Sequence, residues 1–168
     1  IDMVGYEYQP VILSQLPSIE NGDAEIVTTS VQPGSPAMDA DGNIVLLEVG
    51  KKFRPAGCRS DDCVVTYEGK GDAFAMDQMI VTFRLREGVT WADGTPMTSD
   101  DSVYAFDLSR DARSISNTYL IDRTYTYEAT DPLTVQWWSM PGFIDPTYFT
   151  NFWTPAPKHL WGEFLANQ

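Results

Sequence analysis

The chain has 168 residues, with 24 Asp or Glu against 11 Lys or Arg, so its formal net charge is −13. A surface of that sign repels phosphate backbones and anionic lipid headgroups, which argues against nucleic acid as a partner. Hydrophobic residues make up 43% of the chain, enough for a folded core, and no apolar run approaches the roughly 20 residues that span a bilayer.

The first residues, IDMVGYEYQP, begin at Ile1 and lack the basic and apolar regions of a signal peptide. We therefore expect an excised or processed piece of a longer protein. Residues 7–23 place apolar side chains between Pro10, Pro17 and an Asn-Gly turn. This pattern predicts a short helix of about two turns.

Between residues 25 and 67, β-branched runs alternate with turn-rich connectors. The runs EIVTTSV, NIVLLEV and CVVTYE each predict a short strand. Cys58 and Cys63 lie in this region with four residues between them, a spacing that suits a small disulfide-closed loop. A structural zinc site would need further Cys or His ligands, and the single histidine, His159, is about 100 residues away. We expect a disulfide, hence an oxidising compartment, with two free thiols as the alternative.

Residues 79–86, MIVTFRLR, alternate between apolar and polar side chains, which predicts a strand with one buried face. The dipeptide Asp93-Gly94 is typical of a tight turn. Thr98 then stands at an N-cap position, with the acidic Asp101 three residues later and an apolar run after it. These signals predict a helix that begins just after Thr98.

The last third of the chain predicts a hairpin and two short helices. Residues 124–139 indicate a strand, an Asp-Pro turn and a second strand, with Tyr125, Tyr127 and Ala129 on one face. An aromatic stretch and a helix begun by Pro157 follow. Strands and helices alternate without βαβ spacing, so we predict an α+β fold with a mostly antiparallel sheet and short flanking helices.

Catalytic chemistry finds little support in the sequence. Acidic residues in the first turn of a helix are stabilised by its dipole, and Asp-Gly is a turn signal, so Asp93 and Asp101 have structural explanations. A calcium loop starting at Asp39 would place Ile44 where glycine is required. His159 has no activated serine motif to accompany it. We predict no catalytic residue, metal or cofactor.

The stretch FRLREGVTWADGTPMTSDDSVYAF resembles the signature of the family 5 extracellular solute-binding proteins, the peptide, nickel and oligosaccharide receptors of ABC importers. Residues that stand at matching places are Leu85, Arg86, Gly88, Val89, Trp91, Asp93, Gly94, Thr95, Pro96, Thr98, Asp101, Val103 and Phe106. The segments YEYQPVILSQLPSIENG, EATDPLTVQWW and TPAPKHLW are also similar to parts of that family. Ser102 departs from the pattern, since relatives usually carry an aliphatic residue there.

The resemblance implies a fragment of a class II periplasmic-binding-protein-like fold. Residues 1–168 would form a single subdomain of the first lobe, interrupted by a β-rich insertion over residues 29–77 (the insertion). The expected protein is an extracytoplasmic, non-enzymatic receptor, periplasmic or on the cell surface with or without a lipid anchor. It would capture a peptide or similar small solute for an ABC permease, and this segment would not insert into the membrane.

In this family the signature serves as scaffold, so Asp93, Gly94, Pro96, Thr98 and Asp101 are predicted to be structural. By position in the family, the loop after the signature helix reaches the ligand cleft, which suggests Asn117 and Tyr119 as ligand-binding residues, with packing as an equal alternative for Tyr119. Two other classes remain open: a secreted carbohydrate-binding module, suggested by the β-rich organisation and the Trp and Tyr content, and a small hydrolase that uses His159.

Overall fold

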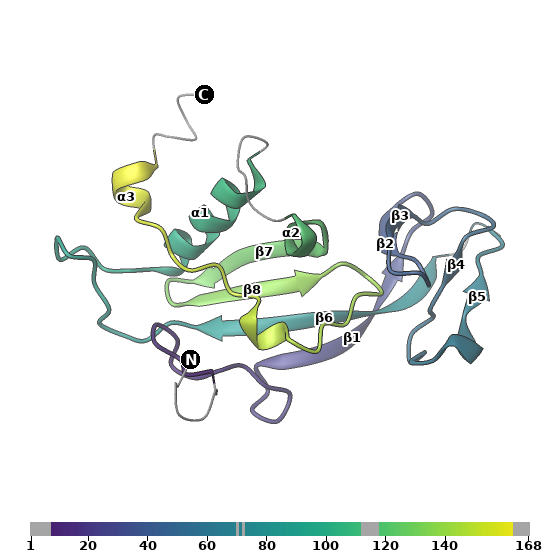
Figure 1. Cartoon of the computed structure of the whole chain (residues 1–168), viewed down its shortest axis with the longest axis horizontal. Coiled ribbons are helices and arrows are strands. Elements are labelled where there is room, and N and C mark those ends of the chain that lie inside the picture. Colours follow the sequence, from purple (N-terminus) through teal and green to yellow (C-terminus); the bar gives the residue numbers. More distant parts are fainter. Residues whose placement is uncertain (1–7, 70, 72, 112–117, 163–168) are drawn as a thin grey trace.

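A four-stranded antiparallel sheet lies at the centre of the computed structural model, which describes residues 8–69, 71, 73–111 and 118–162. Its strands follow the order β1-β6-β8-β7 (Figure 1). Their bounds are Ala24–Val31 for β1, Phe74–Arg84 for β6, Thr124–Asp131 for β7 and Thr134–Ser139 for β8. The predicted α+β class with a mostly antiparallel sheet is confirmed.

The main core covers one face of this sheet. Alternation along β6 places Met79, Val81 and Phe83 on that face, and the register sets Val81 opposite Trp137 of β8. All four side chains are buried. The prediction of a single buried face for this strand holds only toward its end. Ile80, on the other face, is also buried, and so is Gln78 just before the predicted stretch, where its side-chain amide donates to the Ser139 carbonyl at 2.7 Å.

Helices α1 (Ser99–Arg110) and α2 (Tyr119–Asp122) and the segment that follows β8 cover the core face, and α3 (Lys158–Trp161) contacts α1. Helix α1 also contacts β7 and β8. The chain after β8 crosses in front of the sheet and contains the 3-10 helix η2, Tyr148–Thr150 (Figure 1). Aromatic residues of this segment pack against the core: Tyr148, Phe152 and Trp153.

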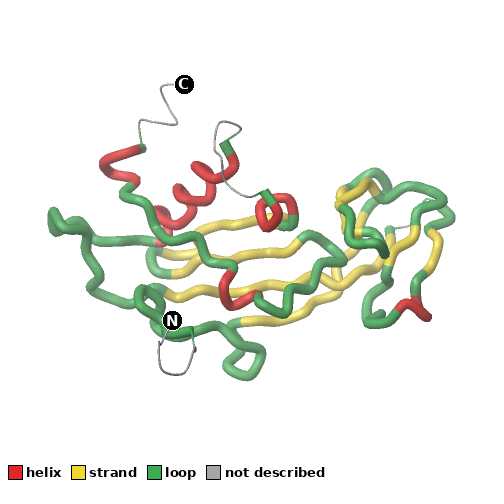
Figure 2. The backbone as a smooth tube through the Cα atoms, viewed as in Figure 1, coloured by secondary structure: helices red, strands yellow, loops and turns green. Residues whose placement is uncertain are grey.

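Within the predicted insertion, the first and last residues belong to β1 and β6 of the main sheet, and the described residues between these strands form a smaller lobe at one end of the sheet (Figure 2); this lobe is called the insertion below. Strands β2 (Pro36–Met38) and β3 (Ile44–Leu46) make one small sheet, and β4 (Lys52–Phe53) and β5 (Val65–Thr66) make another. The 3-10 helix η1, Asp61–Cys63, precedes β5. The lobe has a second core made of Val31, Ala37, Leu47, Phe53, Tyr67 and Met76.

The predicted N-terminal helix is absent from the described residues 8–23. The chain there continues the edge of the main sheet instead: Leu13 forms an isolated bridge with Leu85. The Ser14 N–H donates to the Arg84 carbonyl at 2.8 Å, and the Arg86 N–H donates to Ile12 at 2.8 Å. Two prolines interrupt a helix in this stretch, and pairing with the end of β6 satisfies the backbone.

The predicted shared face of Tyr125 and Tyr127 is also wrong. The register of β7 on β8 shifts between Thr124 and Thr126, which is a β-bulge. A bulge inserts one extra residue and reverses the alternation of side chains before it. Tyr125 is therefore 56% exposed, whereas Tyr127 is buried.

Candidate functional site

The signature turn is held together by its own polar groups. Asp93 Oδ1 accepts the Thr95 N–H at 2.9 Å, Gly94 has a φ of +85°, and Pro96 forms a bridge with Thr90. Asp93 Oδ2 lies 2.8 Å from His159 Nε2. The Thr95 N–H, and after it His159, lower the pKa of Asp93 to about 2 by stabilising the carboxylate. This arrangement explains the residues as scaffold.

Asp101 joins three parts of the molecule. Its carboxylate accepts the backbone N–H of Thr98 at 2.9 Å, the indole Nε1–H of Trp91 at 3.3 Å and the N–H of Lys158 at 3.1 Å. Thr98 and Asp101 form a capping box at the start of α1. Asp101 is 5% exposed, so a buried carboxylate ties the signature turn, the helix cap and α3 together.

Ser102, the departure from the family pattern, belongs to a buried polar network. Its Oγ lies 2.7 Å from the Tyr127 hydroxyl and donates to the Trp153 carbonyl, and the Trp153 N–H donates to the Tyr127 oxygen at 3.2 Å. Burial raises the pKa of Tyr127. A serine at this position therefore suits the tyrosine that faces it on β7.

Tyr119 opens helix α2 and is 55% exposed, while Asn117 lies outside the described residues. The guanidinium carbon of Arg123 sits 3.9 Å from the centre of the Tyr119 ring. Arg123 Nη1 donates to the Tyr119 carbonyl, and Nη2 donates to the Gly42 carbonyl of the insertion, both at 3.1 Å. The Tyr119 ring is thus supported by an arginine that is itself fixed by two segments.

A cavity of about 460 Å³ lies beside α2. Its lining includes Phe106, Asp107 and Arg110 of α1, Ile121 of α2 and Tyr125 of β7. Cavities of this volume suit small solutes, and this one mixes aromatic, acidic and basic side chains. The cavity lies next to Tyr119, but Tyr119 is not among the residues that line it.

Arg123 is not among the residues predicted for the site, although its spacing from Tyr119 indicates a contact between them. Residues four apart on a helix are neighbours, so Tyr119 and Arg123 could have been paired from their spacing. The contact with Gly42 could not, because the two residues are far apart in sequence. The contact of Asp101 with Lys158 also joins residues far apart in sequence, so spacing could not predict it.

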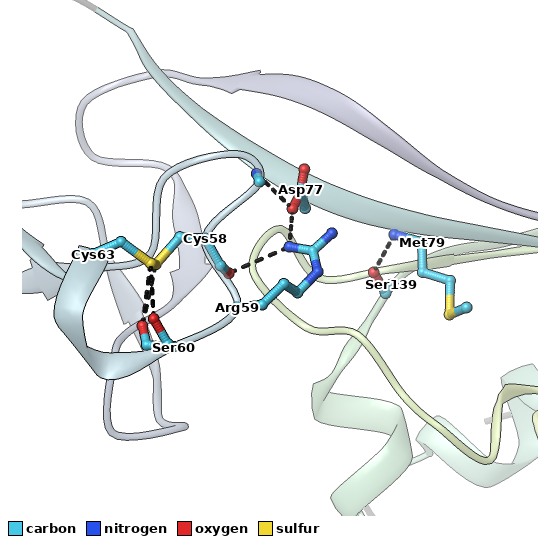
Figure 3. A network of polar contacts seen from close by, with 8 residues as sticks. Cys58, Arg59, Ser60, Cys63, Asp77, Met79 and Ser139 are labelled. Atoms are coloured by element: carbon cyan, nitrogen blue, oxygen red, sulfur yellow. Dashed lines mark hydrogen bonds and ion pairs between the residues drawn. A yellow bond between two sulfur atoms is a disulfide. The ribbon is translucent and has the colours of Figure 1, made fainter.

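Cys58 and Cys63 are joined by a disulfide, with their Cα atoms 5.7 Å apart. The bond closes a short loop, and residues in and next to this loop contact the main sheet (Figure 3). The Gly57 N–H donates to Asp77 Oδ2 at 2.9 Å, and Arg59 Nη1 pairs with the same oxygen. Asp77 belongs to β6, so the loop is fastened directly to the central strand.

A family model described as bacterial extracellular solute-binding proteins, family 5, matches residues 75–160, just over half of the chain. An uncharacterised protein, y4wM, from Sinorhizobium fredii is 36% identical over 63 residues, covering 36% of this chain and 10% of that protein.

Two solved structures are similar to the chain. One is an oligopeptide-binding protein from Thermus thermophilus in complex with a pentapeptide, with a TM-score of 0.53 and 15% identity over 94% of this chain and 19% of the other. The other is the ABC transporter substrate-binding protein CtaP from Listeria monocytogenes, with a TM-score of 0.41 and 29% identity over 49% of this chain and 18% of the other. The chain thus spans a fifth or less of each of these relatives. Among helices of the described residues, none combines the length and hydropathy needed to cross a bilayer.

Proposed function

The chain belongs to the bacterial extracellular solute-binding proteins of family 5, and from this we propose that it is the part of a receptor that helps to capture a peptide or similar small solute for an ABC permease. The observation that carries the proposal is the match over residues 75–160, which includes the signature turn, α1, α2 and the hairpin β7–β8. The protein would act outside the cytoplasm as a binding protein, without catalysing a reaction.

Within this function, Tyr119 is the proposed ligand contact. Tyr119 is more than half exposed at the start of α2, and the Arg123 guanidinium lies over its ring in a cation–π contact. An aromatic ring held in one orientation loses little conformational entropy when it packs against a ligand. Asn117 stays a proposal from its position in the family.

The hydrolase alternative gains no support from the described residues. His159 Nε2 pairs with Asp93 on an exposed turn, and no hydroxyl or thiol of the described chain hydrogen-bonds to that histidine. The carbohydrate module is less favoured because Phe152 and Trp153 pack against the main core. Trp161 is 47% exposed, so titration with soluble glycans remains the measurement that would revive that alternative.

The test uses the full-length receptor and a set of tri- to pentapeptides, since the similar Thermus protein was solved with a pentapeptide. Tyr119→Ala should weaken the affinity measured by calorimetry about 10-fold, the loss of one good aromatic contact, and leave the melting temperature unchanged. Tyr8→Ala is the matched control, because Tyr8 is 51% exposed and lies on the N-terminal segment. Equal affinities for the two variants would remove Tyr119 from the site, and a receptor that binds no peptide would refute the peptide assignment.

A further inference from the structure

A second cavity, of about 330 Å³, lies between the insertion and the segment that follows β8. Arg54 and Arg59 line it from the insertion, Phe143 and Ile144 from the other segment, and Asp77 from β6. Its volume is within the range of small-molecule sites. None of these residues belongs to the cavity beside α2.

Arg59 carries hydrogen-bond donors that no described residue uses. Both of its hydrogen bonds come from Nη1, which donates to Asp77 Oδ2 and to the Cys58 carbonyl (Figure 3). Among the described residues, Nε and Nη2 have no acceptor. These two nitrogen atoms form one edge of the guanidinium with parallel N–H groups, the geometry that receives a carboxylate through two hydrogen bonds.

The guanidinium is fixed before any ligand arrives. Asp77 is 8% exposed and pairs with Arg59, and the Gly57 N–H donates to the same carboxylate oxygen. The disulfide between Cys58 and Cys63 closes the loop that carries Arg59. The Arg59 side chain is nevertheless 52% exposed, so a solute can reach it. A fixed donor pair costs less ordering on binding than a mobile one.

The charges and the walls of the cavity narrow the class of ligand. Its lining includes two guanidinium groups, Arg54 and Arg59, and one carboxylate, Asp77. Asp61, which is not a lining residue, pairs with Arg54, so positive and negative charges at the cavity balance and the unused donor edge of Arg59 is what favours an anionic group. Arg54 is held in place by the Ala40 carbonyl and Asp61. Phe143 is buried, and Ile144 is half-buried beside it. A positive edge beside apolar side chains suits a carboxylate with a compact apolar body.

We propose that this cavity binds a small carboxylic acid with a compact apolar body, whose carboxylate pairs with the Nε and Nη2 edge of Arg59 and whose apolar body packs against Phe143 and Ile144. This site is separate from Tyr119 and does not depend on the proposed peptide capture. A free acid and a C-terminal leucine of a peptide both carry a carboxylate next to an apolar body, so the test includes a ligand of each kind.

The experiment titrates the ¹⁵N-labelled full-length receptor with 4-methylpentanoate and follows the Arg59 Nε–H resonance, assigned by its disappearance in Arg59→Lys. We expect a saturable shift with the acid and none with 4-methylpentanamide, which keeps the apolar body and lacks the charge. N-acetyl-leucine stands for the peptide terminus. Tighter binding of either acid supports the site and identifies the source. No shift with either acid, or equal shifts with acid and amide, would overturn the proposal.

Variants test the role of the donor edge. Arg59→Lys keeps the charge but lacks the two parallel donors, so the affinity for 4-methylpentanoate should fall about 10-fold or more. Arg84→Lys is the matched control, because Arg84 is 51% exposed and pairs with the buried Asp23 just as Arg59 pairs with Asp77. Equal losses in the two variants would show a nonspecific charge effect and refute the assignment. A Tyr119→Ala protein should bind the acid normally even if its peptide affinity is lost.

Discussion

Replacing Asp101 by alanine should destabilise the fold far more than replacing its neighbour Asp100. Asp101 is 5% exposed and accepts hydrogen bonds from Thr98, Trp91 and Lys158. Asp100 shares the first turn of α1 but has an exposed side chain, paired with Lys158 at 3.8 Å. The two carboxylates therefore experience the same helix dipole and differ in burial and partners.

The magnitude follows from the three donors that Asp101→Ala would strand. A hydrogen bond to a charged group contributes about 1.5–3 kcal/mol, but the Trp91 contact is long at 3.3 Å, and removing the carboxylate also removes its cost of desolvation. We expect Asp101→Ala to lower the free energy of unfolding by about 3 kcal/mol. For Asp100→Ala the loss of the dipole interaction is about 0.3–1 kcal/mol.

Urea and thermal denaturation of the two variants would measure the difference. For a domain of this size about 1 kcal/mol lowers the melting temperature by 2–4 °C, so Asp101→Ala should melt about 6–12 °C below the parent chain. Asp101→Asn keeps one acceptor oxygen and should fall between the two. Losses of stability that are equal at Asp100 and Asp101 would refute the reasoning, since only the dipole term is common to both.

Three further predictions concern the turn and the disulfide. Gly94→Ala should cost about 1 kcal/mol in an unfolding titration, because the glycine has a φ of +85° while its absent Cβ would meet open space; no loss would show that the turn relaxes. Asp93 has a folded pKa of about 2 against an ordinary value of 3.8, so its contribution to stability is complete above pH 4 and is lost as the pH falls toward 2. Asp93→Asn should flatten that part of the curve of stability against pH. An unaltered curve would contradict this prediction. Replacing Cys58 and Cys63 by alanine should cost roughly 2 kcal/mol, the loop-closure value for so short a loop, and a variant as stable as the parent would show that the bond constrains little.

The elements that the sequence predicts well are those specified by neighbouring residues. Alternation in residues 79–86 and the capping pattern at Thr98 are local signals, and strand β6 and helix α1 follow them. The failures have non-local causes. The segment around Leu13 pairs with the end of β6 instead of forming a helix, and the bulge in β7 that exposes Tyr125 depends on the register against β8.

The same division applies to the candidate sites. The position of Tyr119 after the signature helix predicts it as a ligand contact, and its four-residue spacing from Arg123 predicts their pairing. Asp77 binds Gly57 and Arg59 only because the insertion folds back on β6. No local sequence pattern predicts that folding. Asp101 was correctly assigned to the helix cap, but its contact with Lys158 appears only when the chain is packed.

The pairing of β1 with β6 also bears on how such a protein can evolve. Val31 stands directly opposite Phe74 in the ladder, so the chain leaves the sheet and returns to it at adjacent positions. A change in the length of the stretch between these two residues need not alter the order or register of the four strands. Loss of the stretch would leave the side chains of Val31 and Met76 facing water. It would also remove Met38 and Ile44 from the main core and the Gly42 carbonyl from Arg123. Any replacement for this stretch would therefore have to cover Val31 and Met76 and supply an acceptor for Arg123.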